Sequence, residues 1–471
     1  MKLLLLLLLF FLHAQAFAHL KEPYTIEAIE NYIIDKKVTT IPEFIEGFDQ
    51  NTKSNFVLMH TSHSLHGATY QKPRALVFSK TAQLVFSFNG DNSQKNGDKI
   101  ELILFDKTKA TFSAHEIDFG SRKPKVIKNP QSCIGCHGSD LRPNWNGYNF
   151  WSGAYGSNDG RLSSAELDEV KRFVQSAKDH PRYRHLQKLS DQAALINKSD
   201  IGSRTKKAQT IINFTEHIVD MNLLRVKRIL TSHPEYKDFK AALLTLFACG
   251  EDFFRKTLPE DKKMIFTKID SLSRDTKMGY GEYRDKYFEN FMNLLGVDTQ
   301  FLDTSFNIQY FRSSVHHQVI SKYSKGGLDD QYLFKLFSKN DSAIYPFIIN
   351  VEKGGMDVDC QSLADEGKKG LETLSFQSIS SQSVNQDQLT QGKKVFQNVC
   401  LECHKNDDFT GYSFKPESLI ERFKEDPSSY DHFVYRLNKD TPVENRMPLN
   451  REISPEDRAA VQIYIKSFLD Q

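Results

Sequence analysis

The sequence predicts a multidomain α+β protein, with an antiparallel β module near the N-terminus, an all-α middle domain and a small helical C-terminal domain. Two observations support this prediction. The hydrophobic period changes from about 2 to about 3.6 residues near residue 163, and a Ser/Gln-rich stretch precedes the last segment. A length of 471 residues fits about three domains. The predicted divisions are 19–162, 163–372, a linker at 373–388, and 389–471.

The composition excludes several classes of protein. Hydrophobic residues make up 39% and charged residues 26%, which is typical of a globular chain and not of a disordered, collagen-like or coiled-coil one. Lys and Arg number 62 against 60 Asp and Glu, so no basic excess is available for nucleic acid, and we expect no such partner. Six cysteines in 471 residues are too few for a disulfide scaffold.

The first eighteen residues resemble a secretory signal peptide. Lys2 gives a positive start, an unbroken apolar run follows over 3–12, and small residues allow cleavage after Ala16 or Ala18. Ten apolar residues are too few to span a bilayer, and no later apolar run approaches the roughly 18 residues that a span needs. We therefore expect an exported, periplasmic protein with no membrane span.

Residues 50–128 have the character of β-strands. Short runs rich in β-branched and aromatic residues end at turn residues, and hairpin-length loops join them. The pattern predicts an antiparallel meander of roughly five strands, preceded by helix over 24–48. The expected strands are 55–59, 74–78, 83–88, 99–105 and one that begins at 111.

Helical spacing dominates from 163 to about 370. Ser163 and Glu166 form a capping-box pattern, and apolar residues then recur every three or four positions. About five to eight helices are expected. The clearest lie at 163–174, 207–230, 239–257, 281–296 and 328–338.

The C-terminal segment begins and ends with a predicted helix. An apolar stripe includes Gly392 and Phe396. The last helix has Ser454 as its expected N-cap and Pro455 at its first position. Its apolar face consists of Val461, Tyr464, Ile465 and Phe468.

The chemistry of the chain is concentrated in two CxxCH motifs. Each has the sequence of a c-type haem attachment site, in which two thiols on one turn bond the two vinyl groups and the adjacent histidine ligates the iron. Roughly 0.002 such motifs would arise by chance in this composition. The sequence therefore predicts two covalent haems, held by Cys133, Cys136 and His137 and by Cys400, Cys403 and His404.

Two other interpretations of paired cysteines fit less well. A zinc site requires both pairs in one tetrahedron, but the pairs lie in segments of opposite character. A thioredoxin-like redox pair belongs in a βαβ context, which neither motif has.

Residues 389–471 resemble a class I cytochrome c domain. Gly392 to Phe396 lies where the family's N-terminal helix enters the haem motif, and Arg446-Met447-Pro448 resembles the family's sixth-ligand motif. The resemblance implies that His404 and Met447 are the axial ligands of the second iron, with His432 as the rival of Met447. Leu449 replaces the second proline of the usual Met-Pro-Pro. Residues 50–160 look similar to the front half of a set of exported cytochromes of unknown reaction.

The sequence does not decide which group occupies the sixth coordination position of the predicted first iron. Candidates are the distant Met221, a histidine of the β region, or an open or water-bound position. Among the histidines His60, His63, His66 and His115, the first is favoured because it directly follows a strand. Trp145 and Arg142 are equally consistent with contacts to the haem propionates and with packing of a β–α junction.

Two cysteines lie outside the motifs. Cys249 ends an apolar helix and Cys360 lies in a polar loop, and the sequence permits either a disulfide or two unrelated thiols. Asn158-Asp159 indicates a turn rather than a calcium site.

These observations favour a dihaem c-type cytochrome that transfers electrons between redox protein partners. One alternative is a dihaem enzyme of the peroxidase type, in which an open first haem receives electrons from the second. The chain resembles such peroxidases only in this arrangement of two haems, and no matching motif surrounds the first site. A haem-based sensor is the other alternative.

Overall fold

A computed structural model of the chain describes residues 20–62, 64–137, 140–142, 153–155, 164–187, 189, 209–276, 287–288, 290–297, 330–339, 341–352, 355–374, 376, 392–393, 395–396, 430, 433–434, 437 and 455–469. The chain divides into two compact units. The first comprises 1–134 and 152–217, and the second comprises 135–151 and 218–471. Antiparallel strands dominate the first unit and helices the second, so the predicted α+β class is confirmed.

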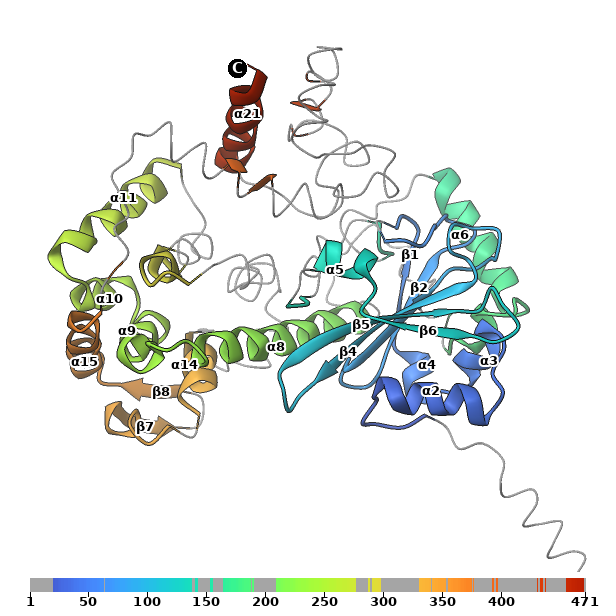
Figure 1. Cartoon of the computed structure of the whole chain (residues 1–471), viewed down its shortest axis with the longest axis horizontal. Helices are drawn as coiled ribbons and strands as arrows, with labels where there is room; N and C mark the ends of the chain where they lie inside the picture. The colour runs from blue at the N-terminus through green and yellow to red at the C-terminus, as the bar shows by residue number, and fades with distance from the viewer. Residues whose placement is uncertain are drawn as a thin grey trace, which may run out of the picture. The chain divides into compact units, whose positions relative to one another are not determined.

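The first unit is built on a six-stranded antiparallel meander (Figure 1). The five predicted strands are present within about two residues of their expected bounds, and a sixth follows them. They are β1 (Phe56–Met59), β2 (Arg74–Phe78), β3 (Leu84–Phe88), β4 (Lys99–Asp106), β5 (Thr111–Asp118) and β6 (Lys125–Lys128).

The two faces of this sheet differ in chemistry because side chains alternate along each strand. On one face Ile100, Leu102 and Leu104 of β4 belong to the hydrophobic core. On the other face Glu101 of β4 lies directly opposite Glu116 of β5. This second face carries buried charge, including Glu116 and Arg74.

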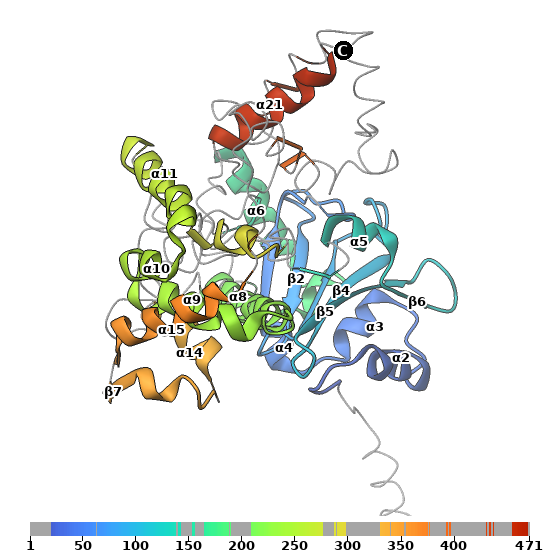
Figure 2. The same cartoon turned by 60° about the vertical axis from the view of Figure 1, so that its left-hand side comes forward.

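Short helices cover the apolar face. The helix expected over 24–48 is two helices, α2 (Ile26–Asp35) and α3 (Ile41–Glu46), and α4 (Gln50–Ser54) follows them. Thr40 and Glu43 form a capping box that begins α3, which explains the break. The Phe48 ring stacks on Phe86 of β3 at 4.7 Å. In Figures 1 and 2 all three helices lie on the same side of the strands.

Helices form most of the second unit. The described helices of the middle region are α6 (Ser164–Ala177), α8 (Gln209–Thr231), α9 (Tyr236–Cys249), α10 (Glu251–Thr257), α11 (Glu260–Thr276), α14 (Asp330–Ser338) and α15 (Cys360–Glu372), of which α6 and the first turns of α8 belong to the first unit. The helix predicted over 239–257 is two helices, because Gly250 has a φ of 80°.

The expectation of an all-α middle region is wrong in one detail. A hairpin of β7 (Ile348–Glu352) and β8 (Gly355–Val358) lies between α14 and α15. Its strands are short and one carries a register irregularity. Hydrophobic periodicity cannot distinguish such strands from a loop.

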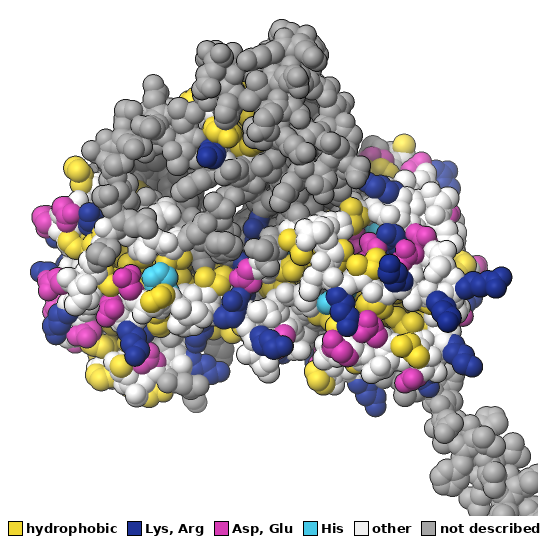
Figure 3. All heavy atoms as spheres, in the orientation of Figure 1, with side chains coloured by type: hydrophobic (Ala, Val, Ile, Leu, Met, Phe, Trp, Pro, Cys, Tyr) yellow, Lys and Arg dark blue, Asp and Glu magenta, His cyan; other side chains and the backbone are white. Residues whose placement is uncertain are grey.

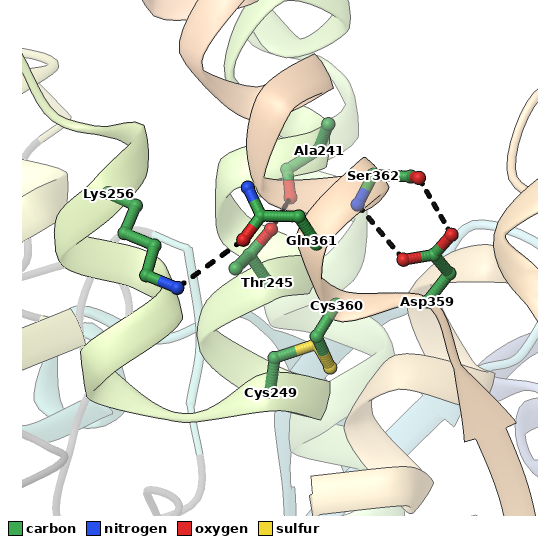
Figure 4. Close-up of a disulfide and its surroundings, with 8 residues drawn as sticks. All are labelled: Ala241, Thr245, Cys249, Lys256, Asp359, Cys360, Gln361 and Ser362. Atoms are coloured by element: carbon green, nitrogen blue, oxygen red, sulfur yellow. Dashed lines mark hydrogen bonds between the residues drawn. A yellow bond between two sulfur atoms is a disulfide. The ribbon is translucent and has the colours of Figure 1, made fainter.

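Cys249 and Cys360 form a disulfide, which decides between the two alternatives that the sequence left open. Cys249 ends α9 and Cys360 is the first residue of α15 (Figure 4). Asp359 caps α15 by accepting a hydrogen bond from the Ser362 backbone N–H at 3.0 Å. The disulfide joins residues that are 111 positions apart in the sequence. A Cβ added at Gly370 would lie 2.0 Å from the Asp238 carbonyl oxygen, so α15 and α9 approach closely.

The last helix is present as predicted and runs from Pro455 to Leu469 as α21. Val461, Tyr464 and Ile465 are buried, in agreement with the predicted apolar face. Most of the predicted linker at 373–388 and the whole of residues 1–19 lie outside the described residues. Among the helices that the structure describes, none has both the length and the hydropathy needed to cross a membrane.

Candidate functional site

The first CxxCH motif forms a short helix, α5 (Gln131–His137), directly after β6. Asn129 with a φ of 47° and Pro130 turn the chain between the two elements. Cys133, Cys136 and His137 occupy positions i, i+3 and i+4 of α5, which fall on one side of a helix. The first motif thus lies within a single short helix.

His137 makes a hydrogen bond that fixes its chemical form. Its Nδ1 lies 2.7 Å from the backbone carbonyl oxygen of Arg142. Because a carbonyl can only accept, Nδ1 carries the proton, and in the neutral imidazole Nε2 is the basic nitrogen. A histidine that ligates a metal characteristically donates its other ring N–H in this way.

Hydrogen bonds and an ion pair hold His137, Asp140 and Arg142 in place. The Arg142 backbone N–H donates to the His137 carbonyl oxygen at 3.0 Å, so the two residues bond each other twice. Between them, both carboxylate oxygens of Asp140 accept from Arg228 Nη2 at 2.7 Å. Arg225 Nη2 donates to the Asp140 carbonyl oxygen at 3.1 Å.

Cys133 carries a thiol of low reactivity. Burial raises its pKa to about 12, and the nearby carboxylates of Glu101 and Glu116 raise it further. Thioredoxin-like pairs need a cysteine whose pKa is lowered. The environment of Cys133 thus argues against the redox-dithiol interpretation. Glu101 and Glu116 lie on the charged face of the sheet, so Cys133 lies near that face. Figure 2 shows α5 on the other side of the strands from α2 and α3.

Polar groups on this charged face form two hydrogen-bonded sets. Arg74 Nη2 donates to Ser87 Oγ and to Glu101 Oε2, both at 2.8 Å. Lys99 Nζ donates to Glu116 Oε1 at 2.8 Å. No sequence motif marks these residues. Their signal is a charged residue within the apolar alternation of a strand, as with Glu101 between Ile100 and Leu102.

His66 is adjacent to the same carboxylate as Cys133. Its Nδ1 lies 3.8 Å from Glu101 Oε2, and its side chain is fully buried. Burial lowers its pKa to about 4, so the ring is neutral at neutral pH. Within the described residues neither ring nitrogen has a hydrogen-bond partner. A buried polar group without a partner calls for a physical explanation, such as a ligand.

His60 lies at the end of β1 among aromatic rings. It stacks on Tyr70 with ring centroids 4.5 Å apart and is tilted against Tyr155 at 5.1 Å. Its Nδ1 is 3.1 Å from the Thr61 hydroxyl, and its buried Nε2 has no hydrogen-bond partner among the described residues. Burial lowers its pKa to about 4 as well.

His115 lies on the opposite face of the sheet from Cys133. It pairs in register with Leu102, a core residue, and its charged neighbours include Glu27 and Glu30 of α2. The sheet itself therefore separates His115 from the first motif. This placement makes His115 a weaker candidate than His60 or His66 for the predicted sixth ligand.

The structure describes only some of the other candidate residues. Arg142 and Met221 are buried, the latter in α8. Residues outside the described part of the chain are His63, Trp145, Asn158, Asp159, Cys400, Cys403, His404, His432 and Met447. Their predicted roles stay predictions.

The helix that leads to the second motif contacts the last helix. A Cβ added at Gly392 would lie 1.9 Å from the Ala460 carbonyl oxygen of α21, so the two backbones approach as closely as only glycine allows. Phe396 packs on Tyr464, with ring centroids 5.7 Å apart.

Comparisons with known proteins identify no relative: no family model, curated protein or solved structure matches the chain. A search of the described residues finds no cluster of three or more His, Cys, Asp or Glu side chains of the kind that holds a metal ion.

Proposed function

We propose that the chain is an exported, periplasmic dihaem c-type cytochrome that transfers electrons between redox protein partners. The main observation in support of this proposal is the pair of CxxCH motifs. The first of them lies in a helix whose histidine donates its Nδ1–H to a backbone carbonyl. A c-type haem supplies a one-electron iron couple where it is bound.

The residues present at the first motif fit such a group. Cys133 and Cys136 are the proposed covalent anchors, and His137 Nε2 is the proposed iron ligand. The raised pKa keeps the Cys133 thiol protonated at neutral pH, which argues against a redox-active thiolate. Two neutral histidines with buried, unpartnered ring nitrogens in the described part of the chain, His60 and His66, are candidates for the sixth position.

At the second motif the proposed anchors are Cys400 and Cys403 and the proposed iron ligands are His404 and Met447. The packing of Gly392 and Phe396 on α21 supports the proposed class I cytochrome c domain, in which the first and last helices enclose the motif. A thioether ligand raises the reduction potential of an iron, which suits an electron carrier.

The disulfide between Cys249 and Cys360 supports export, because such bonds persist in oxidising compartments. Redox protein partners are proposed rather than a polyanion. On the face shown in Figure 3, acidic and basic side chains of the described residues are interspersed.

A pyridine haemochrome assay on the purified chain tests the proposal, and two haems per chain are expected. Cys133→Ala and Cys400→Ala should each reduce the count towards one, because each removes a covalent anchor. The matched control is the double variant Cys249→Ser, Cys360→Ser, which removes two thiols outside the motifs and should keep both haems. A parent count of one would refute one site, and a count of zero would refute the proposal.

The spin state separates a carrier from the alternatives. Resonance Raman spectra of an electron carrier should show only low-spin iron. A high-spin component would favour a dihaem enzyme or a sensor with an open first iron.

A further inference from the structure

We propose that Arg228, acting through Asp140, is a positioning residue that sets the reduction potential of the first haem. The inference rests on the proposed function, because it concerns the haem held at His137. The structure assigns Arg228 this role through three linked contacts, which run from α8 to Asp140, from Asp140 along the loop, and from the loop to the histidine ring.

The first link is an ion pair of unusual geometry. A single nitrogen of Arg228, Nη2, lies 2.7 Å from both carboxylate oxygens of Asp140. The two side chains are 33% and 26% exposed, so water only partly screens the pair. Asp140 is thereby tied to the C-terminal half of α8.

The second link holds the backbone of the same residue. Arg225, whose side chain is 0% exposed, donates from Nη2 to the Asp140 carbonyl oxygen at 3.1 Å. Its Nη1 donates to Asn222 Oδ1 at 3.2 Å. A fully buried guanidinium requires such partners, since burying an isolated charge is unfavourable by several kcal/mol. Asp140 is therefore fixed through both its side chain and its backbone.

The third link reaches the histidine. The Arg142 backbone N–H donates to the His137 carbonyl oxygen at 3.0 Å, and the His137 ring donates to the Arg142 carbonyl oxygen at 2.7 Å. Asp140 precedes Arg142 by two residues. Fixing Asp140 on α8 therefore restrains the carbonyl oxygen that accepts the Nδ1–H bond.

The restraint has an electronic consequence. A well-aligned hydrogen bond from Nδ1–H increases the basicity of Nε2. A more basic axial ligand stabilises the ferric iron and lowers its reduction potential. Loosening the loop should therefore raise the potential of the first haem.

The test separates geometry from charge. Arg228→Lys keeps the positive charge but changes the donor geometry, and the double variant Asp140→Asn, Arg228→Gln keeps the net charge while removing the ion pair. Redox titration of each full-length dihaem protein is expected to show one of two midpoint potentials shifted upward and the other unchanged.

Arg255→Lys is the matched control, since Arg255 also forms ion pairs in the second unit, with Asp252 and Asp270, but makes none with residues 137–142 in the described chain. It should shift neither potential. The inference is overturned if both test variants retain two haems and leave both potentials at the parent values, or if either variant lowers a potential. Fewer than two haems in the parent would instead count against the proposed function.

Discussion

Three buried histidines of the first unit have the same chemical state but different surroundings. His60, His66 and His115 each have a pKa lowered to about 4, with burial as the largest cause. All three are therefore neutral at neutral pH, which is the form that ligates iron. Position, and not protonation, therefore decides which of them can approach the proposed first haem.

Replacing these histidines should identify the sixth ligand of the first iron. His60 follows β1, as the sequence analysis favoured, whereas His66 shares Glu101 with Cys133. We expect either His60→Gln or His66→Gln to convert one low-spin haem to a high-spin form, because an imidazole ligand is lost. Resonance Raman spectra of the two purified variants give the measurement.

His115→Gln provides the control for that experiment. It removes a buried, neutral imidazole from the opposite face of the sheet and should leave the spin state unchanged. If both His60→Gln and His66→Gln retain a fully low-spin spectrum, neither residue is a ligand, and Met221 becomes the next residue to replace.

At the scale of secondary structure, the close contact between Gly392 and α21 holds these two parts of the C-terminal segment together. Gly392 is buried, and a Cβ there would also lie 2.6 Å from the Tyr464 Cβ. Because the closest atoms are backbone atoms of α21, no side-chain rotation can relieve the overlap.

Gly392→Val should therefore separate the two helices. Overpacking a well-packed contact destabilises by about 1–3 kcal/mol, and a contact this close should be at the upper end of that range. Thermal unfolding followed at the Soret band of the second haem measures the effect. Lys393→Ala, at the exposed neighbouring position, should change the midpoint little, and equal midpoints for both variants would contradict the proposed helix contact.

At the scale of the whole molecule, the buried histidines make stability depend on pH. Their pKa values are near 4 in the folded chain and about 6.5 in the unfolded chain. Between these values the unfolded state binds more protons, so the free energy of unfolding falls as the pH is lowered from about 6.5 towards 4. Each histidine contributes at most on the order of 3 kcal/mol to this loss.

Urea unfolding of the holoprotein at pH 7 and pH 5 measures that loss. His115→Gln should reduce the difference between the two pH values, since glutamine does not titrate. An unchanged difference would show that His115 is not the neutral, buried group described above.

The sequence alone determined the features that depend on local pattern. Strand alternation predicted five strands to within about two residues, and helical spacing predicted α8, α14 and α21. Both CxxCH motifs were evident from the order of residues, because each motif consists of residues that are close along the chain. The balance of acidic and basic residues likewise follows from the composition alone.

Only the tertiary structure decided which residues surround the first motif. Nothing in the sequence indicates that Cys133 lies near Glu101 and Glu116, that His115 faces α2, or that Arg228 binds Asp140, 88 residues away. The pairing of Cys249 with Cys360 across 111 positions was equally open. Each of these contacts depends on how strands and helices pack. Packing brings together residues that are far apart in the sequence, and no local sequence pattern indicates which of them will meet.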